Sequence, residues 1–83
     1  MGQVENYTMA ISLSQEQMEA LNGTTFGAVD TIPRAPVPGF ANFDQATTVT
    51  SVHADLKQVV VTTYWAVPNG ENSASLTTYI VNA

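Results

Sequence analysis

Two strand-forming runs separated by a turn pair constrain the fold of this chain more than any other feature. The first run, residues 56–67 (LKQVVVTTYWAV), is rich in β-branched and aromatic residues, and residues 73–81 continue in the same composition. Between them, Asn69 and Gly70 form a pair that tolerates positive φ at both turn positions. We therefore predict an antiparallel hairpin with strands at about 56–67 and 72–82.

The register of this hairpin follows by counting if Asn69 and Gly70 make a two-residue loop, whereas a longer loop over 68–73 would shift it. Trp65 then faces Ala74, and Val59 faces Ile80. One face collects the large apolar side chains, whereas the other is more polar and can meet solvent or a partner. The predicted core side carries Val59, Val61, Trp65, Leu76 and Ile80.

Apolar residues near the N-terminus recur at the spacing of a helix. Steps of three and four residues connect Val4, Tyr7, Ile11, Ser14, Met18 and Leu21, of which Ser14 alone is polar. Gly23 is a natural stop after the last turn. We predict a helix over about 4–22, whose core face is Val4, Tyr7, Ile11, Met18 and Leu21. Ala10, Leu13 and Ala20 widen its apolar surface, so the helix can pack on its own sheet and on a neighbour.

A shorter helix is the alternative. Ser14 and Gln17 have the spacing of a capping box, which would start the helix at residue 14. We favour the longer helix because the apolar stripe begins earlier.

The segment between helix and hairpin is dense in residues that interrupt regular structure. It contains Pro33, Pro36, Pro38, Gly27 and Gly39. This density argues against a helix and against a central strand, so we expect a loop over 23–43. Residues 45–52 are rich in threonine and predict one further strand. The expected fold is a single α+β domain over 1–83, with an N-terminal amphipathic helix on a small antiparallel sheet of about three strands.

Composition removes several classes of function. The chain has no cysteine, which excludes thiol nucleophiles and cysteine-ligated metal sites. Arg34 and Lys57 are its two basic residues against seven acidic ones, so a nucleic-acid phosphate backbone would be repelled. No run of about 18 apolar residues occurs, so the chain as given is expected to be soluble. We expect neither a cofactor nor a metal site.

One constellation has the residue types of a hydrolase. Ser51, His53 and Asp55 alternate at the end of a predicted strand, but this spacing gives no reason for nucleophile, base and orienting group to meet. Glu16 and Glu19 lie one helical turn apart, without the loop of a calcium site. The expectation is an exposed turn histidine, solvated carboxylates and no enzymatic activity.

Four stretches, in this order, resemble the type IV pilin-like family, and within it the minor pilins and pseudopilins. They are the helix end LSQEQMEALNGTTFG at 13–27, the Pro-Gly-Phe segment at 38–40, DLKQVVVTTYW at 55–65 and SLTTYIVNA at 75–83. The resemblance implies a soluble headpiece and a role as a structural subunit of a type IV pilus or a type II secretion pseudopilus.

That resemblance also implies partners and a location. The partners would be other pilin-like subunits, and the location would run from the inner membrane and periplasm to the cell surface. Members of this family begin with a hydrophobic helix that anchors the subunit in the inner membrane, and no stretch of this sequence matches it. A second hypothesis is a carbohydrate- or surface-binding module that uses Trp65, Tyr64 or Tyr79 as an aromatic platform.

Overall fold

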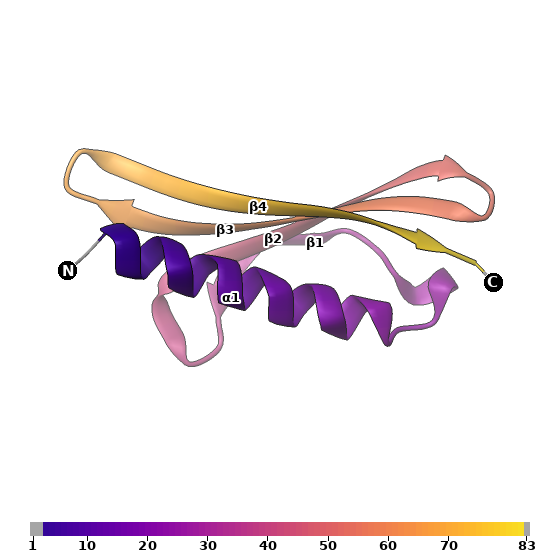
Figure 1. Ribbon diagram of the computed structural model, residues 1–83, viewed down its shortest axis with the longest axis horizontal. Coiled ribbons are helices and arrows are strands. Elements are labelled where there is room, and N and C mark those ends of the chain that lie inside the picture. The colour runs from indigo at the N-terminus through magenta and orange to yellow at the C-terminus, as the bar shows by residue number, and fades with distance from the viewer. Residues whose placement is uncertain (1–2, 83) are drawn as a thin grey trace.

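The computed structural model describes residues 3–82, with side chains from Glu5 onward (Figure 1). One helix is followed by a short 3₁₀ turn and four strands. The elements are α1 (Gln3–Asn22), η1 (Phe26–Ala28), β1 (Ile32–Val37), β2 (Phe40–His53), β3 (Leu56–Val67) and β4 (Gly70–Val81).

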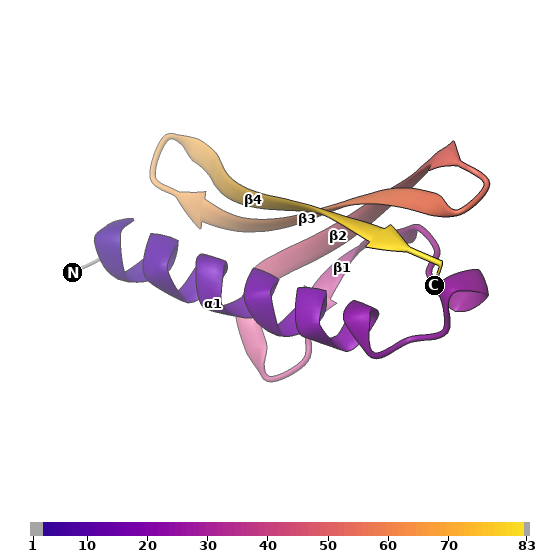
Figure 2. The ribbon, with the colours of Figure 1, turned by 45° about the vertical axis from the view of Figure 1, so that its right-hand side comes forward.

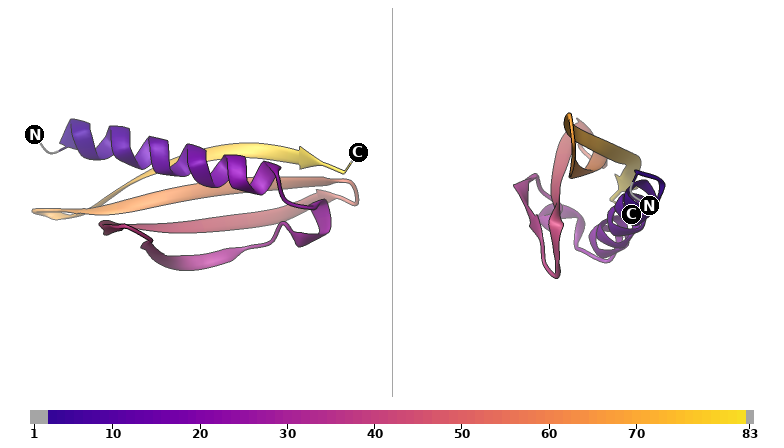
Figure 3. Two further views of the ribbon diagram at one scale, coloured as in Figure 1. Left: turned by 90° about the horizontal axis from the view of Figure 1, so that it is seen from below. Right: turned by 90° about the vertical axis from the view of Figure 1, so that its left-hand side faces the viewer.

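The four strands form one antiparallel sheet in the order β1-β2-β3-β4, so each strand pairs with the next along the chain. Helix α1 lies along one face of this sheet and contacts β3 and β4 (Figure 1). Seen end-on, the helix stands beside a single face of the twisted sheet (Figure 3). The molecule is elongated, with principal extents of 43 × 21 × 19 Å.

The sheet has four strands, so the prediction of about three strands was wrong. The additional strand, β1, lies inside the segment expected to be a loop, and β2 begins at Phe40 rather than near residue 45. β1 is an edge strand paired only with β2, and its ladder is interrupted twice. An edge strand needs hydrogen bonds on one side only, so it tolerates proline, which lacks a backbone N–H.

The turn of the β3–β4 hairpin differs from the predicted one by one residue. Val67 pairs with Gly70, so the two loop residues are Pro68 and Asn69. Proline suits the first turn position, where φ near −65° is required. A loop of Asn69 and Gly70 would instead have required the backbone N–H of Pro68 to donate a hydrogen bond, and proline has no such N–H. Gly70 instead begins β4 with a φ of 147°, a value that favours glycine.

The hairpin register is therefore shifted by two residues. Trp65 faces Asn72, and Thr63 faces Ala74, where Trp65 opposite Ala74 was expected. Because side chains alternate between faces with a period of two, a two-residue shift keeps every side chain on its predicted face. Val59, Val61 and Trp65 are buried. Leu76 and Ile80 point to the same face but are only half-buried.

The helix spans the range of the longer alternative, and Ser14 lies in its middle rather than at its start. At the C-terminal end, the Gly23 N–H donates to the Glu19 carbonyl at 3.2 Å. The Thr24 hydroxyl donates to the Ala20 carbonyl at 2.8 Å. These bonds satisfy carbonyls that a helix end otherwise leaves open.

The helix buries a face next to the predicted one. Ala10, Leu13, Ser14 and Leu21 are buried. Ile11 and Met18, expected in the core, are half-buried at its border, and Tyr7 is 54% exposed. The side chain of Val4 lies outside the described residues. Small side chains such as Ala10 and Ser14 let the helix backbone approach the sheet closely, which leaves the bulkier residues along its flank.

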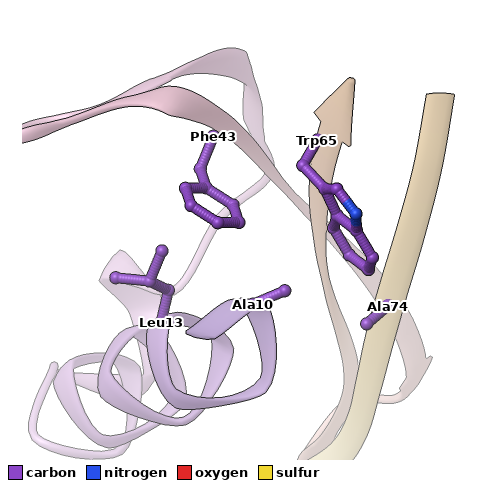
Figure 4. Packing of buried hydrophobic residues seen from close by; sticks show 5 residues of the cluster. All are labelled: Ala10, Leu13, Phe43, Trp65 and Ala74. Atoms are coloured by element: carbon purple, nitrogen blue, oxygen red, sulfur yellow. The ribbon is translucent and has the colours of Figure 1, made fainter. Parts of the chain in front are cut away.

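Two apolar clusters fill the space between helix and sheet. The first surrounds Trp65 and the second surrounds Val59 and Val61. Figure 4 shows the first cluster, in which Phe43 and Trp65 descend from β2 and β3 toward Ala10 and Leu13 of α1. The members are Ala10, Leu13, Phe43, Trp65 and Ala74 in the first, and Leu21, Val29, Val59 and Val61 in the second.

A hydroxyl pair lies within this apolar interior. The oxygens of Ser14 and Thr63, both fully buried, are 2.7 Å apart. The Ser14 hydroxyl also reaches the Ala10 carbonyl at 2.9 Å, and Gln45 Nε2 donates to the Thr63 hydroxyl at 3.1 Å. Each buried hydroxyl is thus hydrogen-bonded, as burial of polar groups requires.

Candidate functional surfaces

The hydrolase-like residues lie at the hairpin between β2 and β3, where all three are exposed. Asp55 approaches His53 with its backbone and not with its carboxylate, since the Asp55 N–H donates to His53 Nδ1 at 3.3 Å. The ring nitrogen that an orienting carboxylate would hold is therefore engaged by a local turn. This arrangement is that of an exposed turn histidine and lacks the geometry of a catalytic triad.

Within residues 3–82, no group of three or more histidine, aspartate or glutamate side chains is placed to hold a metal ion. Glu16 and Glu19 are both exposed on α1.

Within the same range, no helix combines the length and the apolarity needed to cross a membrane.

The three aromatic residues considered for a binding platform do not form one. Trp65 is only 4% exposed and lies beneath the helix. Tyr64, on the opposite face of the sheet, is covered by the guanidinium of Arg34 at 4.0 Å from the ring centroid. Tyr79 is 55% exposed, and Gln58 Nε2 donates to its hydroxyl at 3.2 Å. A platform that depends on Trp65 is thus excluded by burial.

Arg34 connects the two outer strands across the open face of the sheet. From β1, its Nε donates to Asp44 Oδ2 at 3.1 Å and its Nη1 donates to Glu71 Oε1 at 3.0 Å. A second hydrogen bond, from Nη2 to Glu71 Oε2, makes the contact bidentate. The hydrogen bond from Arg34 lowers the pKa of Glu71 below its ordinary value, against a smaller effect of desolvation. This exposed cluster is structural, because its charges are used to hold strands together.

The lowered pKa of Glu71 predicts a pH dependence. The stabilisation from the ion pair is complete above the ordinary carboxyl pKa of 4.5 and is lost as pH falls through the lower pKa of the folded state. We expect the stability difference between the wild type and Arg34→Gln to shrink below that value, as measured by urea unfolding across acid pH. Glu19→Gln, which alters an exposed helix carboxylate, is the control. A difference that stays constant down to low pH would contradict the role of this pair.

A shallow groove runs between α1 and the β1–β2 hairpin. It comprises two adjoining hollows of about 310 and 200 Å³. Leu13 and Ala20 line the helix side, while Val37, Pro38 and Phe40 line the hairpin side. The lining is mostly apolar and brings together no acid, base and nucleophile.

Lys57 of β3 contacts the connection that follows the C-terminal end of α1. Its ammonium group donates to the carbonyls of Phe26 at 2.7 Å and Val29 at 2.9 Å, and it lies 4.5 Å from the Phe26 ring centroid. These contacts fix η1 against β3. Of the two basic side chains of the protein, Lys57 thus joins η1 to β3, and Arg34 joins β1 to β2 and β4.

The face of the sheet away from α1 is covered by no element within residues 3–82 (Figure 2). It is rich in hydroxyl side chains, among them Thr48, Thr50 and Thr77. Thr62 and Ser75 share a cross-strand hydrogen bond of 2.8 Å. Such a surface is weakly charged and solvent-compatible.

Comparison with family models, with curated proteins and with solved structures found no match for this chain.

The free edge of β4 is a surface that the sequence did not predict. β4 is the edge strand opposite β1, and this follows only from the strand order. Alternation correctly predicted which side chains of β4 point to the face of the sheet away from the helix. It did not predict that β4 lies at a free edge of the sheet. The dense prolines of β1 could have indicated which strand occupies the other edge.

Proposed function

We propose that this chain is a structural subunit of a filament, of the minor pilin or pseudopilin kind, acting in a type IV pilus or a type II secretion pseudopilus. Its partners would be other pilin-like subunits, and its location would extend from the inner membrane and periplasm to the cell surface. The proposal rests on the resemblance of the sequence stretches and on the arrangement of one helix along a sheet.

The observation that carries this proposal is the apolar surface that α1 leaves uncovered. Tyr7 is 54% exposed and Met9 is 39% exposed, although the same helix buries Ala10 and Leu13 against the sheet. A helix that is apolar on more than one side is suited to pack on its own sheet and on a neighbouring subunit. The described residues offer contact surfaces and no reaction site, which fits work done by packing.

Site-specific crosslinking tests the filament role. A photoreactive amino acid at Met9 is expected to crosslink the protein, in the cells that produce it, to pilin-like subunits. The same group at Asn42, an exposed position on β2, is the control. Crosslinks from Met9 to no filament subunit, or equally from both positions, would contradict the proposal.

The gene provides a separate test. We expect the coding sequence upstream of Met1 to encode an apolar stretch of about 20 residues, long enough to cross a membrane as a helix. A catalytic domain at that place would contradict the filament role.

A further inference from the structure

The two edges of the sheet are built differently. β1 carries Pro33 and Pro36, and its pairing with β2 is irregular at two places. β4 contains no proline, and its ladder with β3 is unbroken from Val81 to Gly70. Proline and bulges protect an edge from pairing with another strand, and β4 has neither device. Its outer edge is a regular row of backbone donors and acceptors.

The register shows which residues present this row. The Asn82 N–H donates to the Asp55 carbonyl at 2.9 Å, and these two residues continue the β3–β4 register. Antiparallel pairs alternate between hydrogen-bonded and non-hydrogen-bonded, so the even-numbered residues of β4 bond to β3. The odd-numbered residues point their N–H and C=O groups away from the sheet. Within β4 these outward residues are Glu71, Ser73, Ser75, Thr77, Tyr79 and Val81.

We propose that the free edge of β4 pairs antiparallel with β4 of a second copy of this chain, about a twofold axis at Thr77. This centre pairs the five outward residues from Ser73 to Val81 and leaves Glu71, which is bonded to Arg34, outside the paired row. Thr77 then meets Thr77 of the partner, while Ser75 meets Tyr79 and Ser73 meets Val81. A twofold interface needs a self-complementary strand, and this register matches outward residues with outward residues throughout.

Charge favours a second copy as the occupant. From Asn72 to Val81 the strand has no ionisable acid or base other than the Tyr79 hydroxyl, so no like charges oppose each other. The nearest carboxylate, Glu71, lies outside the paired row and is held by Arg34. The two copies of Glu71 would lie at opposite ends of the joined strands. The charged residues that give the net charge of −5 thus lie outside the paired row.

The apolar side chains near this edge support the same contact. Tyr79 and Val81 are 55% and 64% exposed on the outer face. Successive helix residues are rotated by about 100°. Tyr7, Ile11 and Met18 therefore lie on the flank of α1 opposite the flank that lines the groove through Leu13 and Ala20. They therefore face the β4 edge, and Met18 and Ile80 both pack against the second cluster. Pairing would cover the part of these side chains that the monomer leaves exposed.

This dimer is independent of the proposed filament role. The twofold axis makes the two α1 helices antiparallel, whereas subunits of a polar filament all run in one direction. Dimer and filament would therefore be alternative states of the chain, and failure of one would not imply failure of the other.

Cysteine crosslinking tests the pairing directly, because the chain has no cysteine of its own. In a hydrogen-bonded antiparallel pair the two Thr77 Cα atoms would be about 5.5 Å apart, within the range that a disulfide bridges. Under mild oxidation, Thr77→Cys is expected to form a covalent dimer rapidly. Thr48→Cys, on the outer face of β2 and away from the free edge, is the control. Equal crosslinking of both variants would overturn the proposal.

Sedimentation at several protein concentrations measures the association itself. We expect a reversible dimer for the wild type and for Thr77→Val, which keeps the backbone N–H. Thr77→Pro removes an outward N–H without breaking the ladder to β3, so it should be monomeric with an unchanged circular dichroism spectrum. Thr77→Lys places like charges opposite each other and should weaken the dimer about tenfold or more, which keeps the test valid if the proline variant unfolds. A wild type that is monomeric at every concentration, or that pairs only with a strand of another protein, would overturn the inference.

Discussion

Replacement of Trp65 by alanine is expected to remove a large part of the free energy of unfolding of the protein. The indole is 4% exposed and lies at the centre of the first cluster, with its ring centroid 6.4 Å from that of Tyr7 and 6.3 Å from that of Phe43. Removal of a buried tryptophan side chain costs about 3–5 kcal/mol, because apolar burial is lost and a cavity remains. A domain of this length has a total stability of roughly 4–12 kcal/mol. Urea unfolding followed by circular dichroism measures the loss.

Trp65→Phe is the matched control for this prediction. Among the described residues, Trp65 Nε1 is a buried side-chain nitrogen with no hydrogen-bond partner. Phenylalanine keeps an aromatic ring against Phe43 and removes that unpaired donor, so part of the packing loss is offset. We expect Trp65→Phe to remain folded. An alanine variant that loses less than about 1 kcal/mol would show that the first cluster does not hold the helix to the sheet.

The second large effect is expected from Ser14→Leu. Ser14 is fully buried between α1 and β3, and its hydroxyl lies 2.7 Å from that of Thr63. A leucine has no space at this position and would push the helix away from the sheet, at a cost of about 1–3 kcal/mol for overpacking. It would also remove the hydrogen bond to Thr63. Urea unfolding is the measurement, and a lower midpoint is the expected result.

Ser14→Ala separates the two causes. Alanine removes the hydroxyl but adds no volume, and Thr63 keeps its hydrogen bond from Gln45 at 3.1 Å. We expect a loss of about 1 kcal/mol, clearly less than for leucine. If leucine were as stable as alanine at this position, close approach of helix and sheet would not be what selects a small residue there.

The hairpin shows what local pattern can and cannot predict. Alternation placed Val59, Val61 and Trp65 on one face, and all three are buried. The turn was placed one residue too late because Asn69 and Gly70 form a strong turn pair, whereas Pro68 and Asn69 make the loop in the structure. The resulting shift of two residues preserved the faces but changed every cross-strand partner.

The helix shows a different limit. Spacing identified its extent, but the buried face is centred on Ala10 and Ser14 instead of on Tyr7, Ile11 and Met18. Hydropathy favours large apolar residues as the core face. Contact with a sheet favours small residues at the point of closest approach, a preference that becomes visible only when the sheet is present.

By itself, the sequence determined the helix and the face to which each hairpin residue points, because these depend on periodicity within short segments. It also determined that cysteine chemistry is absent. Tertiary structure alone decided that the proline-rich segment forms β1, that Arg34 joins both outer strands, and that β4 has a free edge. Each of these depends on contacts between separate strands, which the pattern within one short segment does not specify.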